Sequence, residues 1–368
     1  MSNAENNLHN QNILMITRTL GQGGTENVVL QLCEILSSIV NKIIVCSSGG
    51  VHEKELQEMG IKHYIIPDIS SKNPVNILKS NLLIKSIIKK EKITIIHSHH
   101  RMAAFYARIS APNAIVKVAN VHNTFTNKKM LTHFAYCNTK LIAVGEMVKK
   151  NLTEYFKIPK EQVCVIHNTI KPFSGIIQNI KILNDERIKG NTLIGNIGRL
   201  SEQKGMRYFI EAAEITARSH PKTKFIIVGD GEEKKKLYQL VKKKGLHDKV
   251  LFLGYRNDIQ NVMKQLDFVV LSSLWEGLPL TPIEAYSVGK TVIATAVDGT
   301  PEVIRDGIDG YLVEPCNPKQ LAKHMNYLIE HPEIRKIMET HAFRRYQDEF
   351  SFLKLTQQYI MFYEGLLQ

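Results

Sequence analysis

The sequence lacks the signals of several common protein classes. No apolar run reaches the ~18 residues that a membrane-spanning helix needs, and the segment 1–11 is polar, without the basic start and apolar stretch of a signal peptide. The five cysteines are scattered and include no CxxC pair, which argues against a disulfide framework or a zinc knuckle. We therefore expect a cytoplasmic protein with reduced thiols.

Acidic residues are scarce relative to basic ones. The chain has 35 aspartate and glutamate residues against 48 lysine and arginine residues, a net charge of +13. Such a charge attracts nucleic acid, an anionic membrane surface, or phosphorylated small molecules and polymers. No zinc finger, basic recognition helix or RNP-type aromatic strand is present, so we expect no nucleic-acid partner. A peripheral contact at the inner face of a membrane stays open.

Long low-complexity segments are also absent, and the chain is too long for one typical domain. It has 368 residues, against roughly 100–200 for a domain, and 43% of them are hydrophobic. Short apolar runs alternate with amphipathic segments, which predicts parallel strands joined by helices. We expect an α/β protein with two Rossmann-like, doubly wound domains facing each other across a cleft. They are predicted at 1–170 and 191–346, with a linker at 171–190 and a C-terminal helix at 347–368 that packs back on the first domain.

One predicted helix, at 75–90, is both basic and amphipathic. Such a helix is able to lie on a membrane surface. Its position between the predicted strands 64–67 and 93–97 favours the alternative, a crossover helix that packs on the core of the sheet.

Two carboxylates lie eight positions apart around a predicted strand-to-helix turn. Glu276 follows the strand at 267–271, and Glu284 lies in a helix that starts near Pro279 and Pro282, since proline suits the first turn of a helix. A structural interpretation competes with a functional one. Thr281 to Glu284 has the form of a capping box, in which Glu284 would satisfy backbone donors, and Glu276 would then be an ordinary loop carboxylate.

Two loops at predicted strand ends suit an anion. Gly23 and Gly24 follow the first strand, where backbone amides and a helix N-terminus favour negative charge. The GxGxxG spacing is absent and the second strand has no acidic residue at its end, which argues against a dinucleotide fold. Arg199 and Lys204 follow the strand at 193–197, and their spacing suits a diphosphate, although a solvated loop is the plain alternative.

Histidines also gather at strand ends. His97, His99 and His100 include an HxH pair, but no third ligand follows at a suitable spacing, so we expect no metal site. His122 follows the strand at 116–121, at the carboxyl end where ligands of open α/β sheets bind. A structural role for His122 is equally open. Two further predicted strands end in tight turns, at Gly229 and at Tyr255–Arg256. Such turns are suited to binding the edge of a nucleoside.

Five motifs occur in a recognisable order. GQGGTE, GRLSEQKG, VGDG, WEGLPLTPIEA and DGTPEVIRDGIDGYLV resemble those of the family-4-type retaining nucleotide-sugar glycosyltransferases, also called group 1, which have the GT-B fold. The resemblance covers nearly the whole chain and is strongest over residues 193–315.

This resemblance implies an activity and a set of roles. It implies a retaining, metal-independent transferase without a cofactor, which moves a hexose from a nucleotide sugar to a glycan, lipid-linked or polymer acceptor in cell-surface polysaccharide or glycoconjugate synthesis. We expect a UDP-sugar, and the chain has no DxD element. The implied catalytic residues are His122, Arg199, Lys204 and Glu276, and the implied donor-binding residues are Gly23, Gly24, Gly229, Tyr255, Arg256, Gly277, Leu278 and Glu284.

Each role has a chemical reason. Arg199 and Lys204, with the amides of Gly23 and Gly24, would stabilise the departing diphosphate. Glu276 would hold a sugar hydroxyl beside the amides of Gly277 and Leu278, Glu284 would bind the ribose, and His122 would contact the sugar near the developing positive charge.

Departures from the family pattern leave the donor sugar open. Leu278 and Pro279 replace an aromatic and a small residue beside the sugar pocket, and His167-Asn168-Thr169 replaces a frequent asparagine-glycine turn. Two other functions compete: an epimerase of nucleotide sugars, and a non-catalytic glycan-binding partner of a transferase. Incubation with donor alone separates the epimerase from the transferase.

Overall fold

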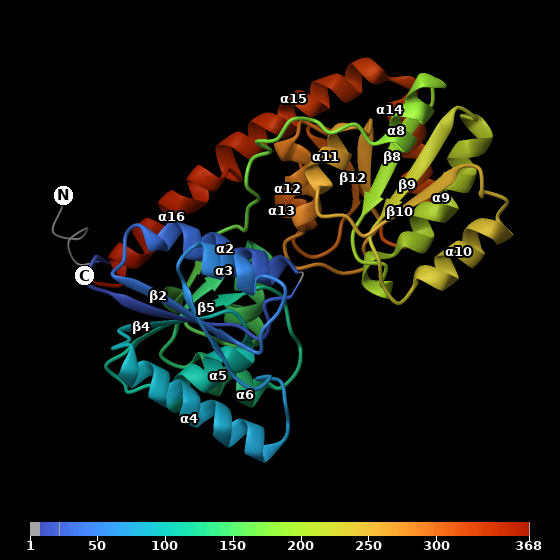
Figure 1. The fold of residues 1–368 in the computed structure, drawn as a ribbon. Helices are drawn as coiled ribbons and strands as arrows, with labels where there is room; N and C mark the ends of the chain where they lie inside the picture. Colours follow the sequence, from blue (N-terminus) through green and yellow to red (C-terminus); the bar gives the residue numbers. More distant parts are fainter. Residues whose placement is uncertain (1–7, 22, 368) are drawn as a thin grey trace. The chain divides into compact units, whose positions relative to one another are not determined.

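A computed structural model of the chain describes residues 8–21 and 23–367; Gln22 of the first glycine turn lies outside them. The chain forms two compact units, Met1–Asn168 with Leu355–Gln368, and Thr169–Lys354. Each unit has its own parallel sheet with helices packed on it (Figure 1). The predicted pair of Rossmann-like, doubly wound domains is therefore confirmed. None of the helices in the described ranges is long and apolar enough to cross a membrane.

Unit 1 is built on a seven-stranded sheet in the order β3-β2-β1-β4-β5-β6-β7. Its strands are β1 (Asn12–Ile16), β2 (Lys42–Ser47), β3 (Lys62–Ile65), β4 (Ile95–Ser98), β5 (Val116–Val121), β6 (Lys140–Ala143) and β7 (Val163–Val165). Its helices are α2 (Gly24–Ser37), α3 (Glu53–Glu58), α4 (Pro74–Lys90), α5 (Arg101–Ser110), α6 (Lys129–Tyr136) and α7 (Glu146–Lys150), which continues as a π-helical turn η1 (Asn151–Tyr155), and a short 3₁₀ turn η2 (Lys160–Gln162) precedes β7.

Helices α4 and α5 cover one face of this sheet. Ile84, Ile87 and Ile88 of α4 and Tyr106 of α5 form one buried cluster with strand residues such as Leu14. Full burial of an aliphatic or aromatic side chain stabilises a fold by about 1.5–3 kcal/mol, so this cluster fixes α4 on the sheet. The prediction that 75–90 is a core-packing crossover is confirmed.

Unit 2 is built on a six-stranded sheet in the order β10-β9-β8-β11-β12-β13. Its strands are β8 (Thr192–Ile197), β9 (Thr223–Val228), β10 (Val250–Gly254), β11 (Phe268–Leu271), β12 (Val292–Thr295) and β13 (Gly310–Val313). Its helices are α8 (Lys181–Ile188), η3 (Glu202–Lys204), α9 (Met206–Ser219), α10 (Lys234–Lys243), α11 (Ile259–Lys264), α12 (Leu280–Ser287), α13 (Thr300–Val303), α14 (Pro318–Glu330) and α15 (Pro332–Glu349), which is followed by α16 (Phe352–Gly365).

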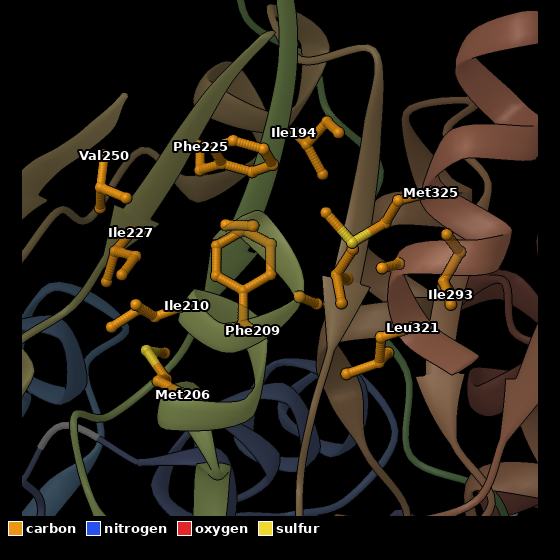
Figure 2. Packing of buried hydrophobic residues seen from close by; sticks show 14 of the residues in the cluster. Ile194, Met206, Phe209, Ile210, Phe225, Ile227, Val250, Ile293, Leu321 and Met325 are labelled. Carbon is orange, nitrogen blue, oxygen red and sulfur yellow. The ribbon is translucent and has the colours of Figure 1, made fainter. Parts of the chain in front are cut away.

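The core of unit 2 centres on Phe209 of α9 (Figure 2). Its ring meets the ring of Phe225 on β9 edge to face, with centroids 6.0 Å apart. Met325 of α14 and Ile194 of β8 belong to the same buried cluster. This packing holds the amino-terminal end of α9, and thus the loop that follows β8, in a fixed position.

The stretch 171–190 differs from the irregular linker that we expected. It contains α8, whose Leu183 and Glu186 are buried. The Glu186 carboxylate pairs with Lys189 at 2.7 Å and with Lys224 of β9 at 3.2 Å. The stretch therefore packs on unit 2. The apolar pattern of α8 is weak because an ion-paired glutamate occupies one of its buried positions.

The last helix, α16, packs on unit 1 through a buried polar network. The Tyr363 hydroxyl lies 2.6 Å from His97 Nδ1, and His97 Nε2 lies 2.8 Å from Asn120 Oδ1. Asn120 Nδ2 donates to the Tyr359 hydroxyl at 2.7 Å. Because an amide oxygen only accepts, Nε2 of His97 carries the proton and Nδ1 accepts from Tyr363. The network ties α16 to β4 and β5.

Candidate functional site

Each sheet has one point where the strand order reverses, between β1 and β4 in unit 1 and between β8 and β11 in unit 2. Ligands of open parallel sheets bind outside the carboxyl ends of the strands at this point. Most of the residues that the sequence singles out lie in the loops that follow these four strands and their neighbours.

An ion pair bridges the reversal point of unit 2. Lys204 follows β8 and Glu276 follows β11, and Lys204 Nζ lies 2.5 Å from Glu276 Oε1. The Ser273 hydroxyl donates to the same oxygen at 2.6 Å. The Glu276 side chain is only 7% exposed. Its second oxygen has no hydrogen-bond partner among the residues that the structure describes. The pair therefore presents one carboxylate oxygen and the remaining ammonium protons to a ligand.

Glycine allows the two loops to approach this closely. Gly205 has φ +55°, and a Cβ atom there would collide with the carbonyl oxygen of Ser272. The Ser272 hydroxyl donates to the Lys204 carbonyl at 3.1 Å, and Asn196 of β8 donates to the Ser272 hydroxyl at 2.9 Å. These contacts join the loop after β8 to the loop after β11.

The loop after β12 supports Glu276 from another direction. The Glu276 amide donates to Asp298 Oδ2 at 2.7 Å, and the Gly299 amide donates to the Gly277 carbonyl at 3.0 Å. By contrast, the amides of Gly277 and Leu278 have no backbone acceptor in the described part of the chain. These two amides are free to donate to a ligand. The sequence indicates the glycine turn at Asp298 but not its contact with Glu276.

Glu284 is a partly buried carboxyl without a hydrogen-bonded partner in the described ranges. Burial raises its pKa to about 7, and the positive charge of Lys204 opposes this rise. Helix α12 begins at Leu280 after Pro279, with no side-chain cap, so Thr281 and Glu284 both lie inside the helix. The capping-box interpretation is therefore wrong, and the Glu284 carboxyl is available to a ligand.

The raised pKa of Glu284 predicts a pH-dependent stability. The folded chain keeps this proton to a higher pH than the unfolded chain, whose pKa is 4.5. Stability from this group is thus fully present below about pH 4.5 and is lost as the pH rises through 7. We expect Glu284→Gln to unfold a few degrees above the wild type at about pH 8 and at the same temperature at about pH 4. Thermal unfolding followed by circular dichroism across this range is the measurement, and a difference that does not change with pH would contradict the raised pKa.

The remaining predicted site residues of unit 2 differ in whether they are available to bind a ligand. Arg199 is exposed and lies 3.2 Å from Glu232, so its guanidinium can exchange this partner for an anion. Gly229, at φ +139°, packs against the carbonyl of Gly198. Tyr255 is exposed, but Arg256 donates twice to Asp258, at 2.7 Å each. The guanidinium fork of Arg256 is therefore already occupied.

In unit 1, the glycine turn leads directly into helix α2. Gly23 is the N-cap and Gly24 the first residue of α2. Glu26 lies in the first turn and accepts a hydrogen bond from the Thr19 hydroxyl at 2.6 Å. The unpaired amides of a helix N-terminus attract anions, and Glu26 already supplies one negative charge at this end.

A row of histidine rings lies at the carboxyl ends of β4 and β5 in unit 1. The ring centroids of His97 and His99 lie 4.8 Å apart, and those of His99 and His122 lie 5.8 Å apart. Burial lowers the pKa of His97 to about 4 and that of His122 to about 3, so both rings are neutral near pH 7. Both ring nitrogens of His99 and Nε2 of His122 are buried and have no hydrogen-bond partner among residues 8–21 and 23–367. Within the described ranges, no group of three or more His, Cys, Asp or Glu side chains is arranged to hold a metal ion.

Several buried polar atoms at this same edge have no hydrogen-bond partner in the part of the chain that the structure describes. Besides the histidine nitrogens they include the hydroxyls of Thr17, after β1, and Ser98, at the end of β4. Buried polar groups normally have hydrogen-bond partners, so their number here indicates a place for a polar ligand or ordered water. The sequence points to His122, whereas Thr17 and Ser98 carry no sequence signal.

Two family descriptions match the chain. "Glycosyl transferases group 1" matches residues 179–345 and "Glycosyltransferase Family 4" matches residues 22–172. The chain is 30% identical over 316 residues to a UDP-Gal:alpha-D-GlcNAc-diphosphoundecaprenol alpha-1,3-galactosyltransferase of Escherichia coli, and the match covers 79% of this chain and 81% of that protein.

Solved structures resemble nearly the whole chain. A glycosyltransferase from Rickettsia africae has a TM-score of 0.84 at 24% identity, covering 98% of this chain and 99% of its own. Anabaena Alr3699/HepE, in complex with UDP and glucose, has a TM-score of 0.80 at 22% identity, covering 95% of this chain and 98% of its own. These likenesses show a common fold, and the predicted GT-B fold is confirmed.

Proposed function

Because the chain belongs to the family-4-type group 1 glycosyltransferases, we propose that it transfers a hexose from a UDP-sugar, with retention of configuration and without a metal ion, to a lipid-linked or polymeric glycan acceptor. The donor would bind at the reversal point of unit 2. The reaction would serve the synthesis of cell-surface polysaccharides or glycoconjugates.

The ion pair between Lys204 and Glu276 is the observation that carries this proposal. A departing diphosphate needs cations, and a hexose needs hydrogen-bond acceptors for its hydroxyls. Lys204 supplies an ammonium, Arg199 an exchangeable guanidinium, and Glu276 an unpartnered carboxylate oxygen within one loop cluster. The free amides of Gly277 and Leu278 add two donors beside Glu276. This set supports a nucleotide-sugar site better than a site for a neutral ligand.

The contacts of Glu276 favour a holding role over a nucleophilic one. Its Oε1 atom already accepts hydrogen bonds from Lys204 and Ser273, so the lone pairs of this atom are engaged and less available for attack on C1. We therefore propose a front-face transfer in which the leaving phosphate accepts the proton of the acceptor hydroxyl. Glu276 would hold a sugar hydroxyl and Glu284 the ribose. The C1–O bond to the diphosphate breaks as the acceptor oxygen bonds to C1, through an oxocarbenium-like state.

The donor and acceptor classes are supported by relatives. The Escherichia coli relative is named for a UDP-Gal donor and a diphosphoundecaprenol-linked acceptor, and the Anabaena structure holds UDP and glucose. We propose a UDP-hexose donor and a lipid-linked glycan acceptor on this basis. Peripheral contact of the protein with a membrane would follow from such an acceptor. The roles of Gly23, Gly24, Gly229, Tyr255 and Arg256 in donor binding, and that of His122 at the donor sugar, stay predictions.

A donor screen tests the proposed function. UDP and UDP-hexoses are expected to raise the unfolding temperature, since a ligand at about 100 times its Kd stabilises the folded state by about 2.7 kcal/mol. Product analysis with the best donor and a diphosphate-lipid-linked sugar should then show a new glycosidic bond. Isomerisation of the donor without acceptor would identify an epimerase instead, and the absence of any shift with nucleotide sugars would overturn the donor site.

Arg199 provides a second test, because a matched control exists in the same unit. We expect Arg199→Gln to lower kcat/KM by roughly tenfold to a few hundredfold, since a charge-assisted contact to the diphosphate contributes about 1.5–3 kcal/mol. Arg218 is equally exposed, 75% against 73%, and also pairs with a glutamate. Steady-state kinetics of Arg218→Gln should match the wild type. Equal loss in both variants would show that Arg199 acts only through the surface charge.

A further inference from the structure

The positive charge of the chain is concentrated in one stretch of unit 1. Residues 69–145 contain twelve lysine and arginine residues and one acidic residue, Glu91, so they carry +11 of the net charge of +13. Glu91 does not offset this charge at the surface. Its side chain is 7% exposed, pairs with Lys42 and Lys62, and has a pKa lowered to about 2 by Lys62, Tyr64 and Lys42. The excess positive charge of unit 1 therefore lies on the helices α4, α5 and α6 and on the strands and loops that connect them.

Helix α4 also carries an apolar stripe on its solvent side. Val75, Leu78 and Leu82 are 69%, 59% and 56% exposed, and their spacing of three and four residues places them on one face. The exposed residues Lys79 and Lys85 flank this stripe, and the helix contains no acidic residue. The opposite face holds the buried Ile84, Ile87 and Ile88. The helix is thus apolar on both sides, and only one side is covered by unit 1.

Helix α6 continues this surface. Figure 1 shows α4, α5 and α6 on one side of the unit 1 sheet, and Phe105 of α5 contacts Phe134 of α6 with ring centroids 5.7 Å apart. Met130 and Phe134 of α6 are 89% and 44% exposed. Lys128 and Lys129 precede them and are also exposed. Exposed apolar residues rimmed by lysines thus recur on both outer helices.

The exposed apolar residues lie toward the ligand-binding edge of the sheet. Helices α4 and α6 both start from loops that follow the carboxyl ends of β3 and β5, and the stripe occupies the first half of α4. Arg101, next to His100 after β4, donates to Asn127 and Thr132 at the start of α6. The surface therefore borders the edge where His99 and His122 lie.

We infer that this α4–α6 surface, defined by Val75, Leu78, Leu82, Met130 and Phe134 with Lys72, Lys79, Lys85, Lys128 and Lys129, binds an anionic phospholipid bilayer. Apolar side chains that enter the headgroup region together with lysines that meet anionic lipids are the two signals that stable peripheral binding requires. Docking in this way brings the carboxyl edge of unit 1 to the membrane, where the sugar of a lipid-linked acceptor protrudes. The inference rests on the proposed function in one respect, the lipid-linked nature of that acceptor.

Vesicle sedimentation of the full chain tests this inference without donor or acceptor. The wild type should pellet with vesicles of phosphatidylcholine and phosphatidylglycerol, weakly with phosphatidylcholine alone, and less at raised salt. Lys72→Gln/Lys79→Gln/Lys85→Gln should weaken binding by roughly fivefold per lysine, on the order of a hundredfold in all. The separate variant Leu78→Ser/Leu82→Ser should bind vesicles more weakly than the wild type at every salt concentration, because the substitutions remove the apolar contribution to binding.

Matched controls exist on other surfaces. Lys235→Gln/Lys242→Gln/Lys243→Gln removes three charges from α10 of unit 2, and Leu353→Ser/Met361→Ser removes two exposed apolar residues of α16. Both should bind vesicles like the wild type. Wild-type protein that stays in the supernatant, or α4 variants that pellet as the wild type does, would overturn the inference. The UDP-induced thermal shift of each variant should equal that of the wild type, so loss of vesicle binding and loss of the donor site are distinguishable.

Discussion

Replacing Glu276 by glutamine is expected to lower kcat by roughly 10²–10³-fold while the protein stays folded. Glutamine has the shape of glutamate, but its amide carries no charge for the transition state and would offer Lys204 a weaker partner. Removal of one preorganised hydrogen-bonding group at a reacting centre typically costs this much, about 3–4 kcal/mol. Transfer from the UDP-hexose identified by the donor screen is the measurement.

Two controls make the Glu276 result specific. Glu202→Gln changes an exposed glutamate in the η3 turn of the same loop cluster and should leave kcat unchanged. The thermal shift of Glu276→Gln with UDP should persist, because the assigned role of Glu276 concerns the sugar and not the nucleotide. Full activity in Glu276→Gln would remove this residue from the site, and a lost UDP shift would indicate that Glu276 holds Lys204 in place.

Replacing Lys204 by methionine is expected to affect both stability and activity. The Glu276 side chain, 7% exposed, would then lie next to a neutral side chain. Leaving a carboxylate buried without its cation destabilises a fold by about 3–5 kcal/mol, and we expect about 2–3 here since Lys204 itself is 18% exposed. Urea denaturation near neutral pH measures the loss. Activity should fall by at least tenfold, because the diphosphate no longer has the Lys204 ammonium as a partner.

The double variant Lys204→Met/Glu276→Gln separates these two effects. Removing both charges should restore most of the free energy of unfolding that Lys204→Met loses, but none of the activity. The single variants should therefore be strongly non-additive in stability. Additive stability losses would mean that the 2.5 Å ion pair does not couple the two loops in solution.

The regular elements could be predicted because their signals are local. The strand predicted at 116–121 has these bounds, and the one predicted at 267–271 forms one residue shorter, at 268–271, since a short apolar run needs only neighbouring residues. The edge strand β13 and the helices α13 to α15 were not assigned from the sequence. Only the two end residues of strand β13 are buried, and α15 has little contrast between its faces, so neither has a clear local apolar pattern.

The candidate site could be predicted as a set of loops, but not as a set of contacts. Glycines and charged residues at strand ends pointed to Lys204, Glu276 and Glu284, because ligands bind at that edge. The pairing of Lys204 with Glu276 joins residues 72 positions apart and depends on strand order, which no local pattern encodes. In the same way, only the structure shows that the Arg256 guanidinium is already paired with Asp258. It also shows that α12 begins at Leu280, so the Glu284 carboxyl does not cap this helix.

The docking of α16 on unit 1 bears on how the chain is made. Residues 8–21 and 23–168 leave the ribosome before any part of α16 exists, and the network of His97 and Asn120 then lacks Tyr363 and Tyr359. The side chains of His97 and Asn120 would lack these partners until α16 is synthesised, which leaves unit 1 less stable in the interval. Unit 1 thus needs α16, which is synthesised after all of unit 2, and a fragment that ends at residue 168 would not reproduce it.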